Sequence, residues 1–532
     1  MDDSIVIFWL VLGTCLYGLA LISTRFHAAG IGWAVLYLTT LVVDILGWFF
    51  HQPALIYAAA GMWVLFVLVP GAIGKLYQQR LLQKRYSGAR RLAQIIRFLH
   101  PGDGWREQPK LIRALELAQQ GELTTASEIL QRLQGLKSTT GLAAILNLYQ
   151  LTGRWEEFLL WQSLNSHALE RSTHLLPFLL RARGETGDLR GMVELYDRRK
   201  SQIRKLIPPS TRDLCRLPLF AFCGRRPAVE GLFAGSLAAV PAPTREFWLA
   251  TADMAAGKLE LAKRQFDSQL PSADAPLRLA IERRLARLTS QPPPLDAAAE
   301  QVVDEAAREH GHDENFTGRR SLFSKYARAT QIFIVLNVAM FVVETRLGGA
   351  TNEGTLFRLG ALYPPAVHAG QWWRLLASLF LHFGWLHLTM NMLALWILGP
   401  FTEFALGFRR YSLLYLLSGI GSMFVVMHLG SGADGEQMTL GASGSIMGLV
   451  GATAALMLRG WRQHKALSAR RRLTALLLII ALQSLSDSVV PQVSMTGHLS
   501  GAVIGFVIAL LLRDRLGAAA SGPNPTEMPG NR

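Results

Sequence analysis

The chain has 532 residues, of which 50% are hydrophobic and only 17% are charged, and its formal net charge is +16. Soluble proteins usually carry about 25% charged residues. The low charge and a mean hydropathy of +0.24 therefore exclude a disordered chain and indicate that part of it lies in lipid. Three cysteines, Cys15, Cys215 and Cys223, are too few for a disulfide framework, and no CxxC pair is available for zinc or dithiol chemistry.

A helix needs roughly 20 apolar residues to cross a bilayer. Stretches of low charge near this length occur in two clusters. The first predicts three transmembrane helices within residues 1–74, at 4–24, 31–50 and 54–74. The second predicts six more within residues 328–514, at 329–343, 375–402, 411–433, 437–458, 473–486 and 488–512. The sequence therefore predicts an all-α, polytopic membrane protein.

The distribution of Lys and Arg predicts how these helices are oriented. A basic juxtamembrane segment, residues 75–104, follows the third helix and has seven Lys or Arg residues before its first acid, Asp103. We expect this end in the cytoplasm and the N-terminus outside. The acidic turn with Asp434 and Glu436 then lies outside, and the loops rich in arginine lie inside. Most of the excess positive charge is explained by loops that set the orientation of the helices in the membrane. We therefore expect no nucleic-acid partner.

Five glycine turns recur in residues 105–288, at intervals of 32, 34, 37 and 33 residues. They are centred on Gly121, Gly153, Gly187, Gly224 and Gly257. A large apolar residue follows each glycine by eight or nine positions. The period resembles that of tetratricopeptide repeats, which are stacked helix pairs. Arg226 departs from the pattern, since the equivalent positions are apolar, and an irregular helical bundle is the alternative.

Residues 289–327 begin with a proline run and continue with acidic residues, a composition typical of a solvated linker. The tail, residues 515–532, is rich in Ala, Gly and Pro and is expected to be disordered.

The chemistry of the second cluster begins with Gly441-Ala442-Ser443-Gly444, the only GxSG sequence in the chain. Alone it is a weak signal, because a chain with 48 glycines forms such tetrapeptides by chance. Its small residues continue to Gly448 and Gly451, however, and suit the close packing that helices need in lipid. Ser443 is either a nucleophile or a buried serine bonded to its own helix.

The last predicted helix offers a base for Ser443. It contains Gly497-His498 followed by Gly501 and Gly505, a GxxxG face that complements the small residues after Ser443. Both helices run inward from the outer surface, so Ser443 and His498 are expected at matching depth. A neutral imidazole activates a serine hydroxyl by accepting its proton. A Ser-His dyad is therefore favoured over a structural histidine.

A third polar group occurs where the second helix of this cluster enters from outside. His387 and Asn391 are four residues apart and share one helical face, and His382 precedes them. Acyl transfer needs donors aimed at an oxyanion, which amides and imidazoles supply. A metal site at His382, His387 and His498 is disfavoured, since HExxH and a nearby carboxylate are lacking.

Together these motifs make residues 328–514 resemble the rhomboid family of intramembrane serine proteases. The further matching features are Gly370-Gln371-Trp372-Trp373-Arg374 and Glu403. The resemblance implies a six-helix bundle in which Ser443 is the nucleophile and His498 the general base, without a third Asp. It also implies an oxyanion hole from His387, Asn391 and the Ser443 backbone N–H. His382 would be a structural neighbour, and Arg374 and Glu403 would be anchors.

One residue departs from the family pattern. Met447 stands where the family often has an aromatic residue packed against the catalytic histidine, and a polarisable thioether can take that place.

The resemblance implies an active protease that cuts transmembrane segments of other proteins near the outer face. A catalytically inactive rhomboid-like protein that binds membrane proteins is the first alternative, and a membrane-anchored repeat scaffold is the second. We expect no cofactor and no metal. The expected partners are transmembrane substrates, membrane lipid and proteins bound by the cytoplasmic repeats. The expected location is the bacterial inner membrane.

Overall fold

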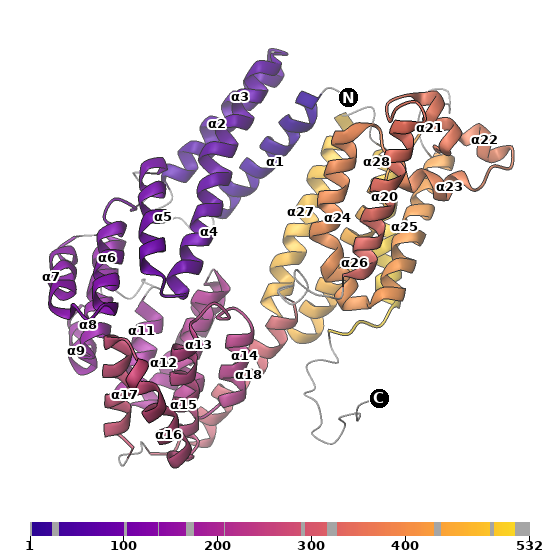
Figure 1. The fold of residues 1–532 in the computed structure, drawn as a ribbon. Coiled ribbons are helices and arrows are strands. Elements are labelled where there is room, and N and C mark those ends of the chain that lie inside the picture. The colour runs from indigo at the N-terminus through magenta and orange to yellow at the C-terminus, as the bar shows by residue number, and fades with distance from the viewer. Residues whose placement is uncertain are drawn as a thin grey trace. The chain divides into compact units, whose positions relative to one another are not determined.

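A computed structural model gives the architecture (Figure 1). It describes residues 3–23, 31–100, 104–136, 138–165, 175–206, 208–288, 293–316, 327–429, 438–489 and 494–516. These ranges contain helices and one isolated bridge, between Leu362 and Thr439, but no strand. The protein is an all-α polytopic membrane protein that divides into two compact units, residues 1–308 and 309–532. The expected tail beyond Leu516 and the acidic turn at 434–436 lie outside the described ranges.

The N-terminal part of the first unit has three apolar helical segments at the positions that the sequence predicts, and the second and third of them are long and apolar enough to cross a membrane. They are α1 (Asp3–Ser23), α2 (Ile31–Phe49) and a third formed by α3 (Pro53–Trp63), η2 (Val64–Leu68) and α4 (Val69–Leu82). Cys15, Ala59 and Trp63 are buried where α1 meets α3. The third helix continues to Leu82, beyond the expected residue 74, because Lys75 and Arg80 do not interrupt a helix that leaves the lipid. Amphipathic α5 (Tyr86–Leu99) follows.

Helix pairs fill the rest of the first unit. They are α6 (Gln108–Gln119) with α7 (Leu123–Gln134), α8 (Thr139–Thr152) with α9 (Trp155–Leu164), α11 (Leu176–Thr186) with α12 (Leu189–Lys205), α13 (Pro209–Phe222) with α14 (Arg226–Ala234), and α15 (Ala242–Ala255) with α16 (Leu259–Gln269), before α17 (Ala275–Ala286). Each pair turns at one of the five expected glycines, all of which have positive φ. Glycine adopts this conformation without a Cβ clash. The aberrant Arg226 pairs with Asp253, whose side chain is buried.

The segment expected to be a solvated linker contains helix α18 (Ala297–Asn315). Ala299, Val303, Ala306, His310 and Asp313 are buried and recur at intervals of four and three residues, so they share one face of this helix. Within the second unit, the Ser468 hydroxyl donates to the backbone carbonyl of Asp313 at 3.0 Å. The sequence does not predict this buried face, because the segment is acidic overall and small and polar residues occupy part of the face.

The second unit contains the six expected bundle helices, which lie side by side in Figure 1. They are α20 (Arg328–Arg346), α24 (Gly384–Leu406), α25 (Phe408–Leu429), α26 (Ser443–His464), α27 (Leu467–Val489) and α28 (Met495–Leu511). Short helices α21 (Glu353–Leu359), α22 (Pro364–His368) and α23 (Arg374–Ala377) form the first loop. Every residue from 444 to 457 is buried, which makes α26 the central helix. Its small residues let its neighbours approach closely.

Two expected helix boundaries are wrong. The span placed at 375–402 is bent by 90° between Arg374–Phe380 and Gly384–Leu406, and Gly384 has a φ of 83° at the bend. The span placed at 437–458 starts as a helix only at Ser443. Within the described residues, four helices are long and apolar enough to cross a membrane, or five with the bent pair counted as one span. The other expected spans are shorter or carry more polar residues.

Candidate active site

Ser443 is the first residue of the central helix α26. The segment before it is tied to the first loop, because Leu362 and Thr439 exchange two backbone hydrogen bonds and the Gly441 N–H donates to the Ser378 carbonyl at 2.9 Å. The first N–H groups of a helix lack partners within the helix and carry its positive end. The Ser443 N–H is therefore suited to binding an oxyanion beside its own hydroxyl.

Gly441 brings Ser443 close to His387. Its φ is +127°, and a Cβ at this position would lie 3.0 Å from His387 Nε2 and 3.8 Å from Ser443 Oγ. The bare glycine Cα therefore borders both groups. The first glycine of the GxSG sequence leaves room for the imidazole.

His387 and Asn391 lie one turn apart near the start of α24. The Phe383 backbone N–H donates to His387 Nδ1 at 3.3 Å, so the other ring nitrogen, Nε2, carries the proton in the neutral ring. Asn391 is 8% exposed, and its Nδ2 has no hydrogen-bond partner within the described residues. A buried donor without a partner is costly. Both side chains therefore offer donors to a ligand.

His382 is fully buried beside this pair. Its ring centroid lies 5.2 Å from that of His387, in an edge-on arrangement. Its backbone N–H donates to Glu344 Oε1 at 3.1 Å, which ties the segment before α24 to α20. His382 thus packs behind His387, as expected of a structural neighbour.

Glycines hold α26 directly against α28, the helix of His498. A Cβ on Gly501 would overlap the carbonyl oxygen of Gly444, and one on Gly505 would overlap that of Gly448. Near the first residues of both helices, the Gly497 carbonyl oxygen would lie 3.9 Å from a Cβ on Gly444. The neighbours of Ser443 and His498 in sequence therefore face each other. The two backbones approach as closely as the sequence predicts.

His498 has a partner that the sequence analysis did not expect. Its Nδ1 lies 2.7 Å from Asp487 Oδ2. The resemblance implies no third Asp, yet in this chain a carboxylate lies beside the His498 ring. In the sequence Asp487 interrupts the apolar stretch between the last two predicted helices, and in the structure it lies near the end of α27.

Two further residues anchor the bundle, as the resemblance implies. Arg374 donates to the carbonyls of Phe357 and Ala361 at 2.7 and 3.0 Å and so closes the first loop. Glu403 accepts hydrogen bonds from the backbone N–H groups of Ala329 and Thr330, at 2.8 and 2.9 Å, and thereby caps α20. Met447 is buried one turn after Ser443.

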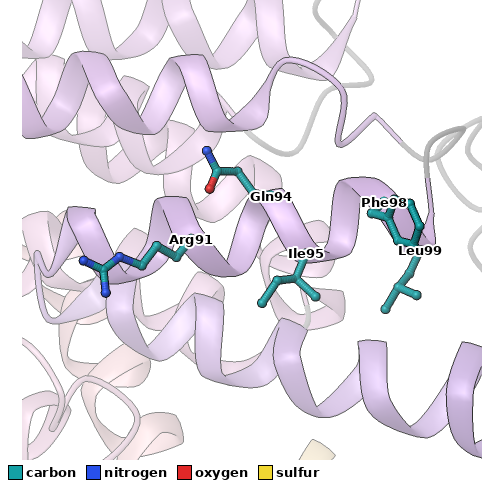
Figure 2. A pocket seen from close by; sticks show the side chains of 5 residues that line it. All are labelled: Arg91, Gln94, Ile95, Phe98 and Leu99. Atoms are coloured by element: carbon teal, nitrogen blue, oxygen red, sulfur yellow. The ribbon is translucent and has the colours of Figure 1, made fainter.

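A separate shallow pocket lies on α5 in the first unit (Figure 2). Its lining residues are Arg91, Gln94, Ile95, Phe98 and Leu99. They include no nucleophile and no general base. The described part of the chain contains no cluster of three His, Cys, Asp or Glu residues that could hold a metal ion.

Part of the second unit is similar in sequence to known proteins. Residues 369–515 match the model of the rhomboid domain. RHOMBOID-like protein 5 of Arabidopsis thaliana is 37% identical over 167 residues, which are 31% of this chain and 52% of that protein. Rhomboid protease GluP of Bacillus subtilis is 33% identical over 183 residues, 34% of each chain. Rhomboid protease AarA of Providencia stuartii is 27% identical over 200 residues, 34% of this chain and 71% of that one.

Residues 369–515 are therefore similar to the rhomboid domain and to rhomboid proteases. The matched region spans about half or less of the length of the first two of these relatives.

Proposed function

We propose that the protein is an intramembrane serine protease that uses Ser443 as nucleophile and His498 as general base. The observation that carries this proposal is the convergence of the site. The start of α26 borders His387 through Gly441 and meets α28 through Gly444 and Gly497. A binding module or an anchor needs no such set of a hydroxyl, two imidazoles and an unpaired amide donor.

The reaction starts when Ser443 Oγ attacks a peptide carbonyl and passes its proton to His498 Nε2. The carbonyl oxygen becomes an oxyanion. His498 then gives the proton to the departing amine. In the second half of the reaction, His498 takes a proton from water as the water attacks the acyl-enzyme, and it returns that proton to Ser443 Oγ. His387 Nε2–H, the Asn391 amide and the Ser443 backbone N–H are the donors for the oxyanion. Such fixed donors stabilise the transition state without reorganising.

The proposed substrates are transmembrane segments of other proteins. A peptide bond in a stable helix is hidden from a nucleophile, so the substrate must unwind near small or helix-breaking residues. Polar residues at membrane depth are tolerated where they line a protein cavity and not the lipid. The site lies near the outer ends of α24, α26 and α28 in the orientation that the basic loops predict.

We further propose that the helix pairs of residues 105–288 are tetratricopeptide-like repeats that bind protein partners in the cytoplasm of a bacterial cell. The repeated glycine turns support this assignment. The topology is tested with Leu164→Cys in α9 and Leu347→Cys after α20, each in a chain without its native cysteines. An impermeant maleimide should label only residue 347 in intact cells, and the reverse pattern would contradict the orientation.

The activity is tested with purified full-length protein, a single-span model substrate and a fluorophosphonate probe. Ser443→Ala should abolish both cleavage and labelling, because the proposed nucleophile is lost. The variant should still fold, because only one hydroxyl is removed from a helix of small residues. Ser445→Ala is the control, since it removes a buried hydroxyl two residues along the same helix. Cleavage by the Ser443 variant at the wild-type rate would refute the serine mechanism.

His498→Ala should resemble Ser443→Ala, and the double variant should be no worse than either, because members of one catalytic unit are not additive. If folded wild-type protein neither cleaves nor reacts with the probe, the alternative of an inactive rhomboid-like binding protein is favoured. That alternative is raised by the plant relative, whose name is RHOMBOID-like protein.

A further inference from the structure

A buried carboxylate lies beside the proposed base. The side chain of Asp487, near the end of α27, is 1% exposed, and that of His498 is 12% exposed. Carboxylates inside a membrane bundle are costly and are usually paired or functional. Both oxygens of Asp487 are engaged, since Oδ2 lies 2.7 Å from His498 Nδ1 and Oδ1 accepts a hydrogen bond of 2.8 Å from Gln483 Nε2.

This pairing determines which nitrogen of His498 carries the proton. A carboxylate only accepts hydrogen bonds, so Nδ1 must be the donor. The neutral ring then has its lone pair on Nε2, the atom that has to accept the Ser443 proton. Gln483 holds the carboxylate from the other side, one helical turn before Asp487. The direction of both hydrogen bonds is thus defined.

We propose that Asp487 is a positioning residue that orients His498 and completes a Ser-His-Asp triad in this rhomboid domain. The proposal rests on the protease function proposed above. When Ser443 attacks, its proton moves to Nε2 while the Nδ1 proton stays hydrogen-bonded to Asp487. The imidazolium is thereby stabilised, and the carboxylate is not itself protonated. The proton on Nε2 later leaves with the amine, so no further reactant is required.

The main test is Asp487→Asn in the purified full-length protein. Gln483 donates to the oxygen that it contacts, so the new amide should turn its NH₂ group toward His498. Nδ1 must then accept, and the proton moves to Nε2, which can no longer act as a base. We expect kcat to fall by about 10²- to 10⁴-fold, as for soluble triads, with KM changed less than threefold. Probe labelling should slow in parallel.

The role of Gln483 supplies a second test. In Asp487→Asn combined with Gln483→Leu, the amide is free to turn its oxygen toward His498 and restore the correct tautomer. We expect this double variant to be at least tenfold more active than Asp487→Asn alone. Gln483→Leu by itself should lose less than tenfold, since it keeps the carboxylate. A double variant no more active than the single one would overturn the tautomer argument.

A spectroscopic measurement separates positioning from folding. Nitrogen-15 shifts of the His498 ring, assigned by comparison with His498→Gln, should show protonation on Nδ1 in the wild type and on Nε2 in Asp487→Asn. Asp487→Glu should keep the wild-type tautomer and recover part of the lost kcat. Circular dichroism and thermal unfolding check that each variant is folded.

The outcomes of the two proposals are distinct. Wild-type kcat in Asp487→Asn, while Ser443→Ala is inactive, would overturn the triad and leave the Ser-His protease intact. Wild-type cleavage by Ser443→Ala would overturn the protease itself. An unchanged His498 tautomer in Asp487→Asn would also contradict the positioning role, whatever the rate.

Discussion

At the residue scale, the candidate site depends on polar side chains and also on a glycine that makes space for one of them. Gly441 has no side chain where His387 approaches, and Asn391 retains a buried donor without a partner among the described residues. The Phe383 N–H orients His387 by donating to its Nδ1. A hydrogen-bond donor held in this way is available to a developing charge without prior rearrangement.

Asn391→Ala tests the oxyanion role. Removal of one such donor costs on the order of 10²-fold in kcat in soluble acyl-transfer enzymes. We expect a smaller loss, of about 10-fold or more, because His387 and the Ser443 N–H remain. Thr389→Ala, which truncates an exposed side chain of the same helix, is the control. Equal kcat values for Asn391→Ala and the control would exclude the amide from the oxyanion hole.

Gly441→Ala tests the steric argument. The added Cβ would lie 2.9 Å from His387 Cε1, closer than side chains tolerate. His387 must move, so we expect a loss of at least 10-fold in cleavage by a folded protein. Gly370→Ala is a matched control, because Gly370 also has positive φ, at +99°, but its added Cβ meets nothing within 4 Å. Similar losses in both variants would assign the effect to backbone strain.

At the element scale, two kinds of contact hold α26 against α28. Glycines on α28 allow its backbone to contact that of α26. Near the C-terminal ends of both helices, Arg459 of α26 donates to the carbonyls of Ala509 and Leu510, at 3.2 and 2.9 Å, which caps the last turn of α28. Small residues matter here because the hydrophobic effect drives helix association only weakly in lipid. Close van der Waals packing between the helices must stabilise their contact instead.

Gly505→Leu should separate α28 from α26, since any Cβ there overlaps the Gly448 carbonyl. Gly505 lies about two turns from His498, so the variant alters none of the proposed catalytic side chains themselves. We expect a lower unfolding temperature in detergent and a loss of cleavage of 10-fold or more. Val503→Leu, at a position 55% exposed on the same helix, should change neither. Full activity of Gly505→Leu would show that the dyad does not need this contact.

At the scale of the whole molecule, the chain divides into two compact units, and the point of division along the sequence, after Arg308, falls within the residues of helix α18. Arg225 pairs with Asp304 at 2.8 Å in the first unit. In the second unit the ring of Phe316, which follows α18, is buried against Gly460. Stacked helix pairs contact mainly their neighbours. The second unit has a hydrophobic core of its own, which includes Phe316.

Deletion of residues 105–288 should spare hydrolysis of a detergent-solubilised model substrate, with a rate within about threefold of the full chain. Processing of native substrates in cells should fall, because the proposed recruiting repeats are lost. The deletion keeps residues 309–316, which pack within the second unit. Correct insertion and folding are checked first. Loss of model-substrate cleavage by a folded variant would show that the repeats maintain the active form of the bundle.

The sequence alone was sufficient to predict the helical class, the membrane clusters and the glycine turns of the helix pairs. These features depend on the length of apolar stretches and on local backbone preference. Both are set by residues that are close together in the sequence. The order and spacing of Ser443, His498, His387 and Asn391 also identified the candidate site. The partner of His498 was missed, because an acid between two apolar stretches is read from sequence as a loop.

Only the tertiary structure decided that Asp487 turns toward His498 and that Gln483 holds it there. It also decided that the second span of the bundle bends by 90° before Gly384, and that a helix with a buried face occupies the acidic linker. These features depend on contacts between residues far apart in the chain or in different helices. Local composition predicts where a helix can form, whereas packing determines which polar groups meet.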